Sequence, residues 1–189
     1  FGKLRVLNDD IIAPGKGFGS HPHHNMEIIT IVLEGRLQHK DNTGVVEVIR
    51  PGEVQVMSAG TGIVHSEVNY SKTHPLKLLQ LWIATKDHNI APRHDLKKYP
   101  ARKNAMQLVV SGKKREGKKD VHGRKKRVGP LFIHQDASIT RGTFGKGKSF
   151  THAIEKGSGA YLFVISGTLS CAGEQLEPRD AIALSGLHA

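Results

Sequence analysis

VLEGRL at residues 32–37 recurs farther along the chain as VISGTL at residues 164–169. In each copy a glycine follows an apolar run, and a proline comes after the next turn, Pro51 in the first copy and Pro178 in the second. The first copy has five more residues between its glycine and its proline. Self-similarity of this kind indicates a duplicated structural unit. We therefore expect a duplicated antiparallel β-barrel, with a lumen of the kind that binds small ligands and metals.

Short apolar-alternating runs, separated by Gly, Pro, Asn and Asp, cover most of the 189 residues and predict an all-β protein. The segment Asp-Asn-Thr-Gly at 41–44 is a hairpin signal between strands at 36–40 and 45–49. A long break at residues 90–100 leads us to place the domain boundary after it, giving domains 1–105 and 106–189. The clearest strands are expected at residues 3–7, 26–33, 45–49, 54–57, 76–83, 106–110, 160–165 and 181–184.

The formal charge of +11 is concentrated in one run, KKREGKKDVHGRKKR at residues 113–127, which holds nine basic and two acidic residues. The run has no aromatic side chain to stack on a base, and Gly117 and Gly123 interrupt any helix. We interpret it as a solvated loop between two apolar strands, with polyanion attraction or a nuclear address as alternatives. A directly and specifically bound nucleic acid is not expected.

Cys171 is the single cysteine, which excludes an internal disulfide and a cysteine zinc cluster and favours a reducing compartment. No run approaches the roughly 18 apolar residues of a membrane span. We therefore expect a cytoplasmic protein, or a nuclear one in a eukaryote, without membrane contact. The sequence starts at Phe1 in what reads as a strand already under way, so we also expect a fragment of a longer chain.

Two pairs of metal-ligand residues have the spacing i, i+2: His21 with His23, and His65 with Glu67. Successive strand side chains alternate between faces, so the members of each pair point to the same side. If the two strands are neighbours, three imidazoles and one carboxylate converge on one point. Such a set with open coordination positions suits Fe(II), Mn(II), Ni(II), Co(II) or Zn(II), and open positions permit catalysis.

Glu27 competes with Glu67 for the carboxylate position, because it follows His23 by four residues and keeps the same parity if the strand runs straight. An isolated His-x-His pair is a weak signal in a chain with twelve histidines, and the second pair strengthens it. The other histidines lack a partner at strand parity or lie in turn-like or basic surroundings. We expect these to be solvated: His24, His39, His74, His88, His94, His122, His134, His152 and His188.

GKGFGSHPH at residues 15–23 and VMSAGTGIVHSEVN at residues 56–69 resemble motifs of the pirin family of the cupin superfamily. The resemblance covers most of the chain outside residues 113–130, and it implies an all-β bicupin of two antiparallel jelly-roll barrels, the second incomplete in this chain. Further segments that carry the resemblance lie at residues 4–10, 26–27, 32–35, 80–83 and 134–136.

The resemblance also implies a ligand set and a range of activities. It places one metal in the N-terminal barrel on His21, His23, His65 and Glu67, and it implies that the C-terminal barrel is degenerate and has lost its site. The second half of the sequence has no His-x-His pair, which agrees with that expectation. Some family members are similar in activity to quercetin 2,3-dioxygenase, and others are transcriptional co-regulators.

Our leading functional prediction is a metal-dependent dioxygenase, with Fe(II) as the first choice of metal, acting on a flavonol or related phenol and O₂. A hydroxy-carbonyl substrate would fill the open metal positions, and Glu67 would serve both as a ligand and as the base that takes the hydroxyl proton. Phe18, Met57 and Trp82 are candidates for pocket walls, with core packing as the alternative. The alternative function is a non-catalytic, metal- or redox-dependent transcriptional co-regulator that binds a protein partner.

Overall fold

The computed structural model describes residues 1–113 and 129–186, so the predicted basic loop lies, apart from Lys113, outside the described residues. Two compact units are distinguished, one of residues 3–149 and one of residues 150–186 with residues 1–2. Regular secondary structure in the described part of the chain consists of β-strands, which confirms the predicted all-β class. No helix there has the length and apolar character needed to cross a membrane.

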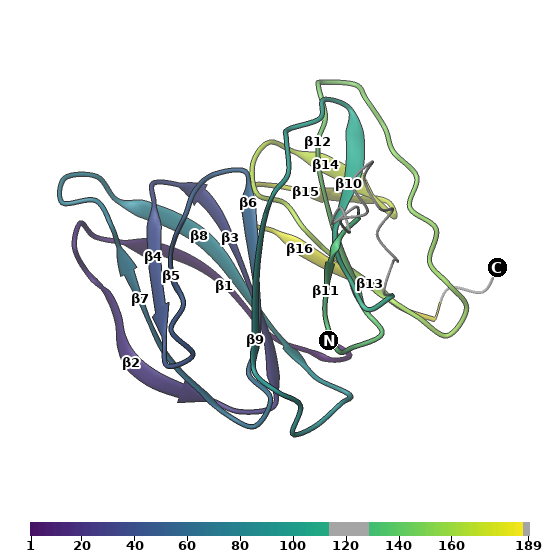
Figure 1. The fold of residues 1–189 in the computed structure, drawn as a ribbon. Helices are drawn as coiled ribbons and strands as arrows, with labels where there is room; N and C mark the ends of the chain where they lie inside the picture. Colours follow the sequence, from purple (N-terminus) through teal and green to yellow (C-terminus); the bar gives the residue numbers. More distant parts are fainter. Residues whose placement is uncertain (114–128, 187–189) are drawn as a thin grey trace, which may run out of the picture. The chain divides into compact units, whose positions relative to one another are not determined.

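The first nine strands of the larger unit form two antiparallel sheets, and the chain crosses repeatedly from one sheet to the other, as in a jelly roll (Figure 1). The expected barrel therefore takes the double-sheet form. The first sheet has the order β1 (Leu4–Ile12), β8 (Leu76–Ala84), β3 (Met26–Glu34), β6 (Glu53–Ser58) and β9 (Arg93–Lys98). The second has the order β2 (Gly17–His23), β7 (Ile63–Asn69), β4 (Leu37–Asp41) and β5 (Val46–Ile49).

Apolar side chains from both sheets pack in the space between them. Val32 and Leu78 of the first sheet share a buried cluster with Leu37 of the second. In another cluster Met57 of β6 packs with Ile63 of β7, and Met57 is only 1% exposed. Burying side chains of this size stabilises the fold by about 1.5–3 kcal/mol each. Met57, a candidate for a pocket wall, is therefore part of the core.

The predicted break at residues 90–100 is wrong, because it contains strand β9. The sequence of β9, RHDLKK, has one apolar residue, Leu96, and so lacks the alternating pattern of a half-buried strand. The strand forms through backbone pairing with β6 at the edge of the sheet, where Val56 lies opposite Asp95. Pro92 and Pro100 flank it, as expected for residues that cannot donate a ladder hydrogen bond.

The predicted hairpin at residues 41–44 is present between β4 and β5, with Gly44 at a φ of 93°. The repeat seen in the sequence also appears in the topology. In the smaller unit β13 (Ala160–Phe163) pairs with β16 (Ala181–Leu184), and β14 (Leu169–Cys171) pairs with β15 (Glu174–Leu176), as β3 pairs with β6 and β4 with β5.

Backbone conformation follows the same repeat. Gly35 and Gly167 have φ values of 82° and 75°, and the residues after the two prolines, Gly52 and Arg179, have φ values of 86° and 78°. A positive φ is rare for a residue with a Cβ atom because it is sterically unfavourable. Arg179 therefore adopts this turn at a conformational cost that Gly52 does not have. The two segments thus share a strand-turn-hairpin-turn-strand plan.

A third sheet belongs to the larger unit and follows β9 in sequence. It consists of β10 (Ala105–Ser111), β11 (Leu131–Phe132) and β12 (Ser138–Thr143), in the order β11-β10-β12. β10 pairs antiparallel with β12 and parallel with β11. These three strands belong to the unit of residues 3–149. The predicted domains 1–105 and 106–189 stay a prediction.

Candidate metal centre

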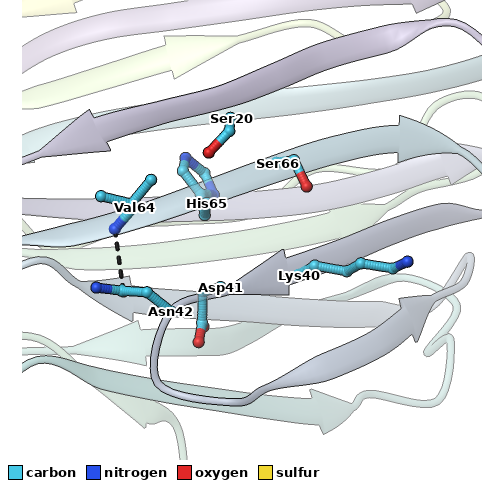
Figure 2. A pocket seen from close by; sticks show the side chains of 7 residues that line it. All are labelled: Ser20, Lys40, Asp41, Asn42, Val64, His65 and Ser66. Carbon is cyan, nitrogen blue, oxygen red and sulfur yellow. Dashed lines mark hydrogen bonds between the residues drawn. The ribbon is translucent and has the colours of Figure 1, made fainter.

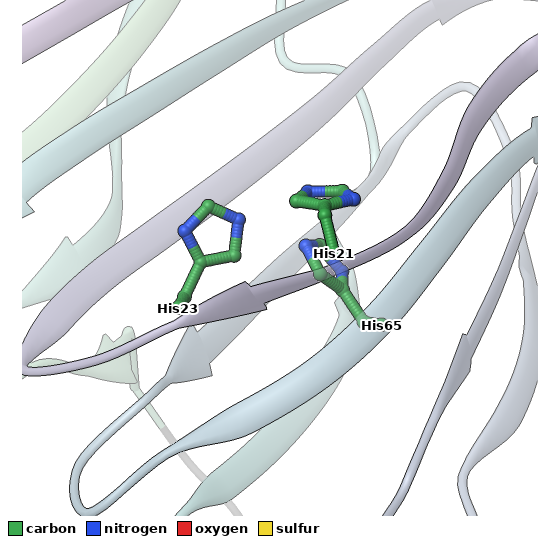
Figure 3. Close-up of side chains that lie close together, drawn as sticks. All are labelled: His21, His23 and His65. Carbon is green, nitrogen blue, oxygen red and sulfur yellow. The ribbon is translucent and has the colours of Figure 1, made fainter.

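Strands β2 and β7 bring three of the predicted ligands together. The strands pair antiparallel with His21 opposite His65, and His23 lies two residues farther along the same face. The ring centroids are 4.4 Å apart for His21 and His65, 4.8 Å for His21 and His23, and 4.9 Å for His23 and His65. One ligand atom from each of the three lies within 4.8 Å of the other two, and Figure 3 shows the three side chains close together.

Glycine allows the close approach of these two strands. A Cβ atom at Gly17 would lie 2.1 Å from the backbone oxygen of Glu67 and 2.6 Å from the Cα atom of Val68. No side chain fits in that space, so the glycine-rich stretch before the His-x-His pair has a steric role. At Gly19 nothing lies within 4 Å of such a Cβ atom, so this steric requirement holds at Gly17 and not at Gly19.

The imidazoles are suited to bind a cation as neutral donors. Burial, followed by the charges of His21 and His39, lowers the pKa of His65 to about 3. Burial and then the charge of His21 lower the pKa of His23 to about 4. His65 Nε2 is buried and has no hydrogen-bond partner among the described residues. Because an unpaired buried polar atom is costly, a ligand for this nitrogen would relieve the penalty.

Glu67 lies on β7 beside the imidazoles and is 2% exposed. Its Oε2 accepts a hydrogen bond of 2.7 Å from Gln80 Nε2 on β8. Burial raises the pKa of the Glu67 carboxyl group, and the hydrogen bond from Gln80 opposes that shift. Glu67 groups with His65 and His39, within the same 4.8 Å limit. The four predicted ligands therefore fall into two groups that share His65.

Glu27, the competing carboxylate, lies on β3 in the other sheet. The positive φ of 46° at Asn25 interrupts the strand after His23, so the parity argument for Glu27 does not hold. Glu27 Oε2 instead accepts a 2.8 Å hydrogen bond from Ser58 Oγ on the neighbouring strand β6. This carboxylate is thus engaged with Ser58, and the three imidazoles come from the opposite sheet.

A cavity of about 610 Å³ adjoins the imidazole group, and Glu67 and His21 both line it. Two of the three candidate wall residues, Phe18 and Trp82, line it as well. Trp82 Nε1 donates a hydrogen bond of 3.0 Å to Gln80 Oε1, and the ring centroids of Trp82 and His23 are 4.9 Å apart. The cavity therefore has an apolar wall, a carboxylate and an imidazole in one place.

The prediction that His39 and His94 are solvated is wrong. His39 is 0% exposed, the His94 side chain is 6% exposed, and their ring centroids are 4.9 Å apart. His39 Nε2 is 2.9 Å from Asp41 Oδ2, and its Nδ1 is 3.5 Å from His65 Nδ1. The signal that could have found His39 is the spacing His39-x-Asp41 at the end of a strand next to a hairpin, which puts both on one face.

Four of the other histidines are exposed, which confirms the expectation of a solvated side chain: His24, His74, His88 and His152. His134 is partly buried and its Nδ1 lies 2.9 Å from Asp87 Oδ2. His122 and His188 lie outside the described residues.

A second, smaller cavity of about 260 Å³ lies beside His65 (Figure 2). The turn after β4 is tied to β7 at this place, since Val64 N donates to Asn42 Oδ1 at 3.1 Å and Asn42 N donates to Val64 O at 3.0 Å. The residues that line this cavity are Ser20, Lys40, Asp41, Asn42, Val64, His65 and Ser66.

Comparison with known proteins gives matches over both halves of the sequence. The family model described as Pirin matches residues 2–83, and the model described as Quercetinase C-terminal cupin domain matches residues 108–189. Quercetin 2,3-dioxygenase of Escherichia coli strain K12 is 39% identical over 184 residues, which cover 97% of this chain and 74% of that protein. The pirin-like protein of Caulobacter vibrioides is 35% identical, over 97% of this chain and 75% of that protein.

Solved structures give the same relationship. The crystal structure of YhhW from Escherichia coli matches with a TM-score of 0.87 at 38% identity and covers 97% of this chain and 73% of that one. A second crystal structure, of the bacterial pirin YhhW in complex with nickel(II), matches with a TM-score of 0.87 at 37% identity, over 99% of this chain and 75% of that one. The jelly-roll unit thus has a solved counterpart that is crystallised with a divalent metal.

Proposed function

Since the chain belongs to the pirin family of the cupin superfamily, we propose that it is a metal-dependent dioxygenase that acts on a flavonol or a related phenol. The proposal rests on the group of His21, His23 and His65. These imidazoles lie beside a cavity of about 610 Å³ that Glu67 also lines. Ligand pockets for molecules of flavonol size typically measure about 300–1,000 Å³. The similarity to proteins named quercetin 2,3-dioxygenase supports the choice of reaction.

His21, His23 and His65 would hold the metal, and Glu67 is the proposed fourth ligand. Bound there, Fe(II), our first choice, would supply the Lewis acidity and the redox chemistry that reaction with O₂ requires, and Zn, Mn, Ni or Co are the alternatives. The low pKa values of His23 and His65, about 4 and 3, keep these imidazoles unprotonated at neutral pH. They are therefore ready to donate a lone pair.

Glu67 is proposed as the base that takes the hydroxyl proton of the phenolic substrate. Burial raises the pKa of its carboxyl group, so the carboxylate is more basic than an exposed one, which suits a base. Gln80 holds one carboxylate oxygen at 2.7 Å, and this fixes the orientation of the group toward the cavity. Phe18 and Trp82 would pack against the planar rings of the substrate.

The experiment that tests the proposal is anaerobic loading with iron(II), followed by addition of O₂ and a flavonol. We expect flavonol loss and carbon monoxide release in the loaded protein and neither in the metal-stripped protein. A matched series with Zn, Mn, Ni and Co identifies the active metal. A lack of turnover with every metal would overturn the proposal and favour the alternative, a non-catalytic metal- or redox-dependent transcriptional co-regulator that binds a protein partner.

We propose a cytoplasmic location for this activity. The single cysteine, Cys171, is a free thiol in the structure, and a chain without disulfides suits a reducing cytoplasm. The substrate is a small phenol with O₂, and neither a membrane nor a directly bound nucleic acid is needed for it. Fractionation of the cell that expresses the protein would test the location.

A further inference from the structure

Asp41, His39 and His65 form a continuous hydrogen-bonded series that ends at one member of the imidazole group. Asp41 Oδ2 lies 2.9 Å from His39 Nε2, and the side chains of both residues are 0% exposed. On the other side of the His39 ring, Nδ1 lies 3.5 Å from Nδ1 of His65. Asp41 and His65 are also register partners in the β4 and β7 ladder. The hydrogen-bonded series thus connects the hairpin turn to a proposed metal ligand, His65.

The hydrogen-bonding capacity of these groups fixes where the protons lie. An ionised carboxylate can only accept, so His39 Nε2 must carry the proton that it donates to Asp41. In a neutral imidazole the other nitrogen is then an acceptor, so His65 Nδ1 must donate to His39 Nδ1. His65 Nε2 is left without a proton, and this is the buried nitrogen that has no hydrogen-bond partner among the described residues.

The hairpin turn locks Asp41 in the orientation that this arrangement needs. Its other oxygen, Oδ1, accepts hydrogen bonds from Thr43 N at 2.9 Å, Thr43 Oγ1 at 2.6 Å and Val45 N at 3.3 Å. Burial acts to raise the pKa of the Asp41 carboxyl group, but these hydrogen bonds and the one from His39 together hold it below its usual range. The carboxylate therefore cannot rotate away from His39 without losing hydrogen bonds to the turn.

We propose that Asp41 and His39 are positioning residues that fix the tautomer and orientation of His65, so that its Nε2 faces the metal as a lone-pair donor. Hydrogen bonds to the second nitrogen of a metal-bound histidine commonly have this effect. The inference rests on the proposed metal centre but not on turnover. It also gives His39 a role other than that of a ligand, although His39 lies within 4.8 Å of His65 and Glu67.

The first test uses the metal-free protein without substitution. The ¹⁵N shifts of imidazole distinguish a protonated nitrogen from an unprotonated one. We expect His65 to carry its proton on Nδ1 and His39 to carry its proton on Nε2. A His65 ring with its proton on Nε2, or a His39 ring with protons on both nitrogens, would overturn the inference, whatever the protein does with a flavonol.

The second test reverses the hydrogen-bond polarity with Asp41→Asn. The three donors on Oδ1 would keep the remaining oxygen in the turn, so the new amide group would point at His39 and donate to Nε2. His39 would then donate from Nδ1, and His65 would move its proton to Nε2, on the metal side. An amide that replaces a carboxylate beside a histidine can impose the wrong tautomer in this way. We expect Ni(II) to bind about 10–100-fold more weakly.

The matched control is Asp87→Asn, because Asp87 and His134 form a second carboxylate and imidazole pair at 2.9 Å outside this group. It should leave the Ni(II) affinity unchanged, and both proteins should bind one equivalent by titration calorimetry. An unchanged affinity and an unchanged His65 tautomer in folded Asp41→Asn protein would overturn the inference. So would a second Ni(II) equivalent that is lost on His39→Gln, since His39 would then be a ligand. If Asp41→Asn does not fold, the spectra of the unsubstituted protein decide.

Discussion

His21 and His65 lie opposite each other in the β2 and β7 ladder, with their ring centroids 4.4 Å apart. The two residues are far apart in sequence, and the antiparallel pairing of two short strands brings them together. His23 joins them because it lies two residues beyond His21 on the same face of β2. A rigid sheet therefore positions all three imidazoles, and the properties of the site depend on that pairing.

Trp82 is the single tryptophan of the chain and offers a reporter of metal binding. Its ring centroid lies 4.9 Å from that of His23, at an interplanar angle of 80°. A paramagnetic ion such as Ni(II) held by His23 would quench the indole at this distance. We expect tryptophan fluorescence to fall on Ni(II) addition and His23→Ala to weaken the response. His24→Ala, at the exposed neighbour, is the control, and an equal loss in both variants would argue against His23 as a ligand.

The metal content should be one ion per chain. The prediction rests on the proposed ligand set in the jelly-roll unit and on the expected loss of a site from the second half of the sequence. Metal analysis after dialysis against a limited excess of iron or nickel would measure it. Two tightly held equivalents would contradict the prediction and point to a second site.

The stability of the metal-free protein should depend on pH through His65. The pKa of this group is about 3 in the folded protein and near 6.5 when unperturbed, so the unfolded state binds a proton more readily. The contribution is therefore fully present above pH 6.5 and is lost as pH falls toward 3, by up to about 1.4 kcal/mol per pH unit. Denaturant titrations between these pH values should show a steeper loss for the wild type than for His65→Gln. Equal slopes would show that burial does not shift this group.

Gly17 should be far less tolerant of substitution than Gly19. A Cβ atom at Gly17 would meet the backbone of Glu67 at 2.1 Å, whereas at Gly19 it would meet nothing within 4 Å. We expect Gly17→Ala to lower the free energy of unfolding by roughly 1–3 kcal/mol. Gly19→Ala should change it by less than about 0.5 kcal/mol. Thermal or denaturant unfolding of the two variants would compare them, and equal effects would refute the steric explanation.

The sequence predicted the parts of the fold that follow from local pattern. Alternating apolar residues identified β3, β6 and β8, and Asp41 to Gly44 identified the hairpin. Strand β9 was missed because backbone pairing, and not an apolar pattern, holds an edge strand such as this one. The i, i+2 rule, which depends only on the pleat, put His21 beside His23 and His65 beside Glu67, and the pairing of β2 with β7 brings His65 to the other two imidazoles. His39 was missed because its partner in the site, His65, comes from a different strand, and only the register of β4 and β7 brings the two together.

If Glu67 is the base for chemistry at the proposed metal centre, the Glu67→Gln substitution should lower the rate per bound metal. The substitution keeps the size of the side chain and one oxygen donor, so the metal should be retained with an affinity about 10–100-fold weaker. Turnover per bound metal should fall by about 10²–10⁴-fold, because a positioned base contributes that much. Glu34→Gln, at an exposed carboxylate paired with Lys77 at 2.8 Å, is the matched control and should change neither quantity. Undiminished turnover per bound metal in Glu67→Gln would show that Glu67 is not the base.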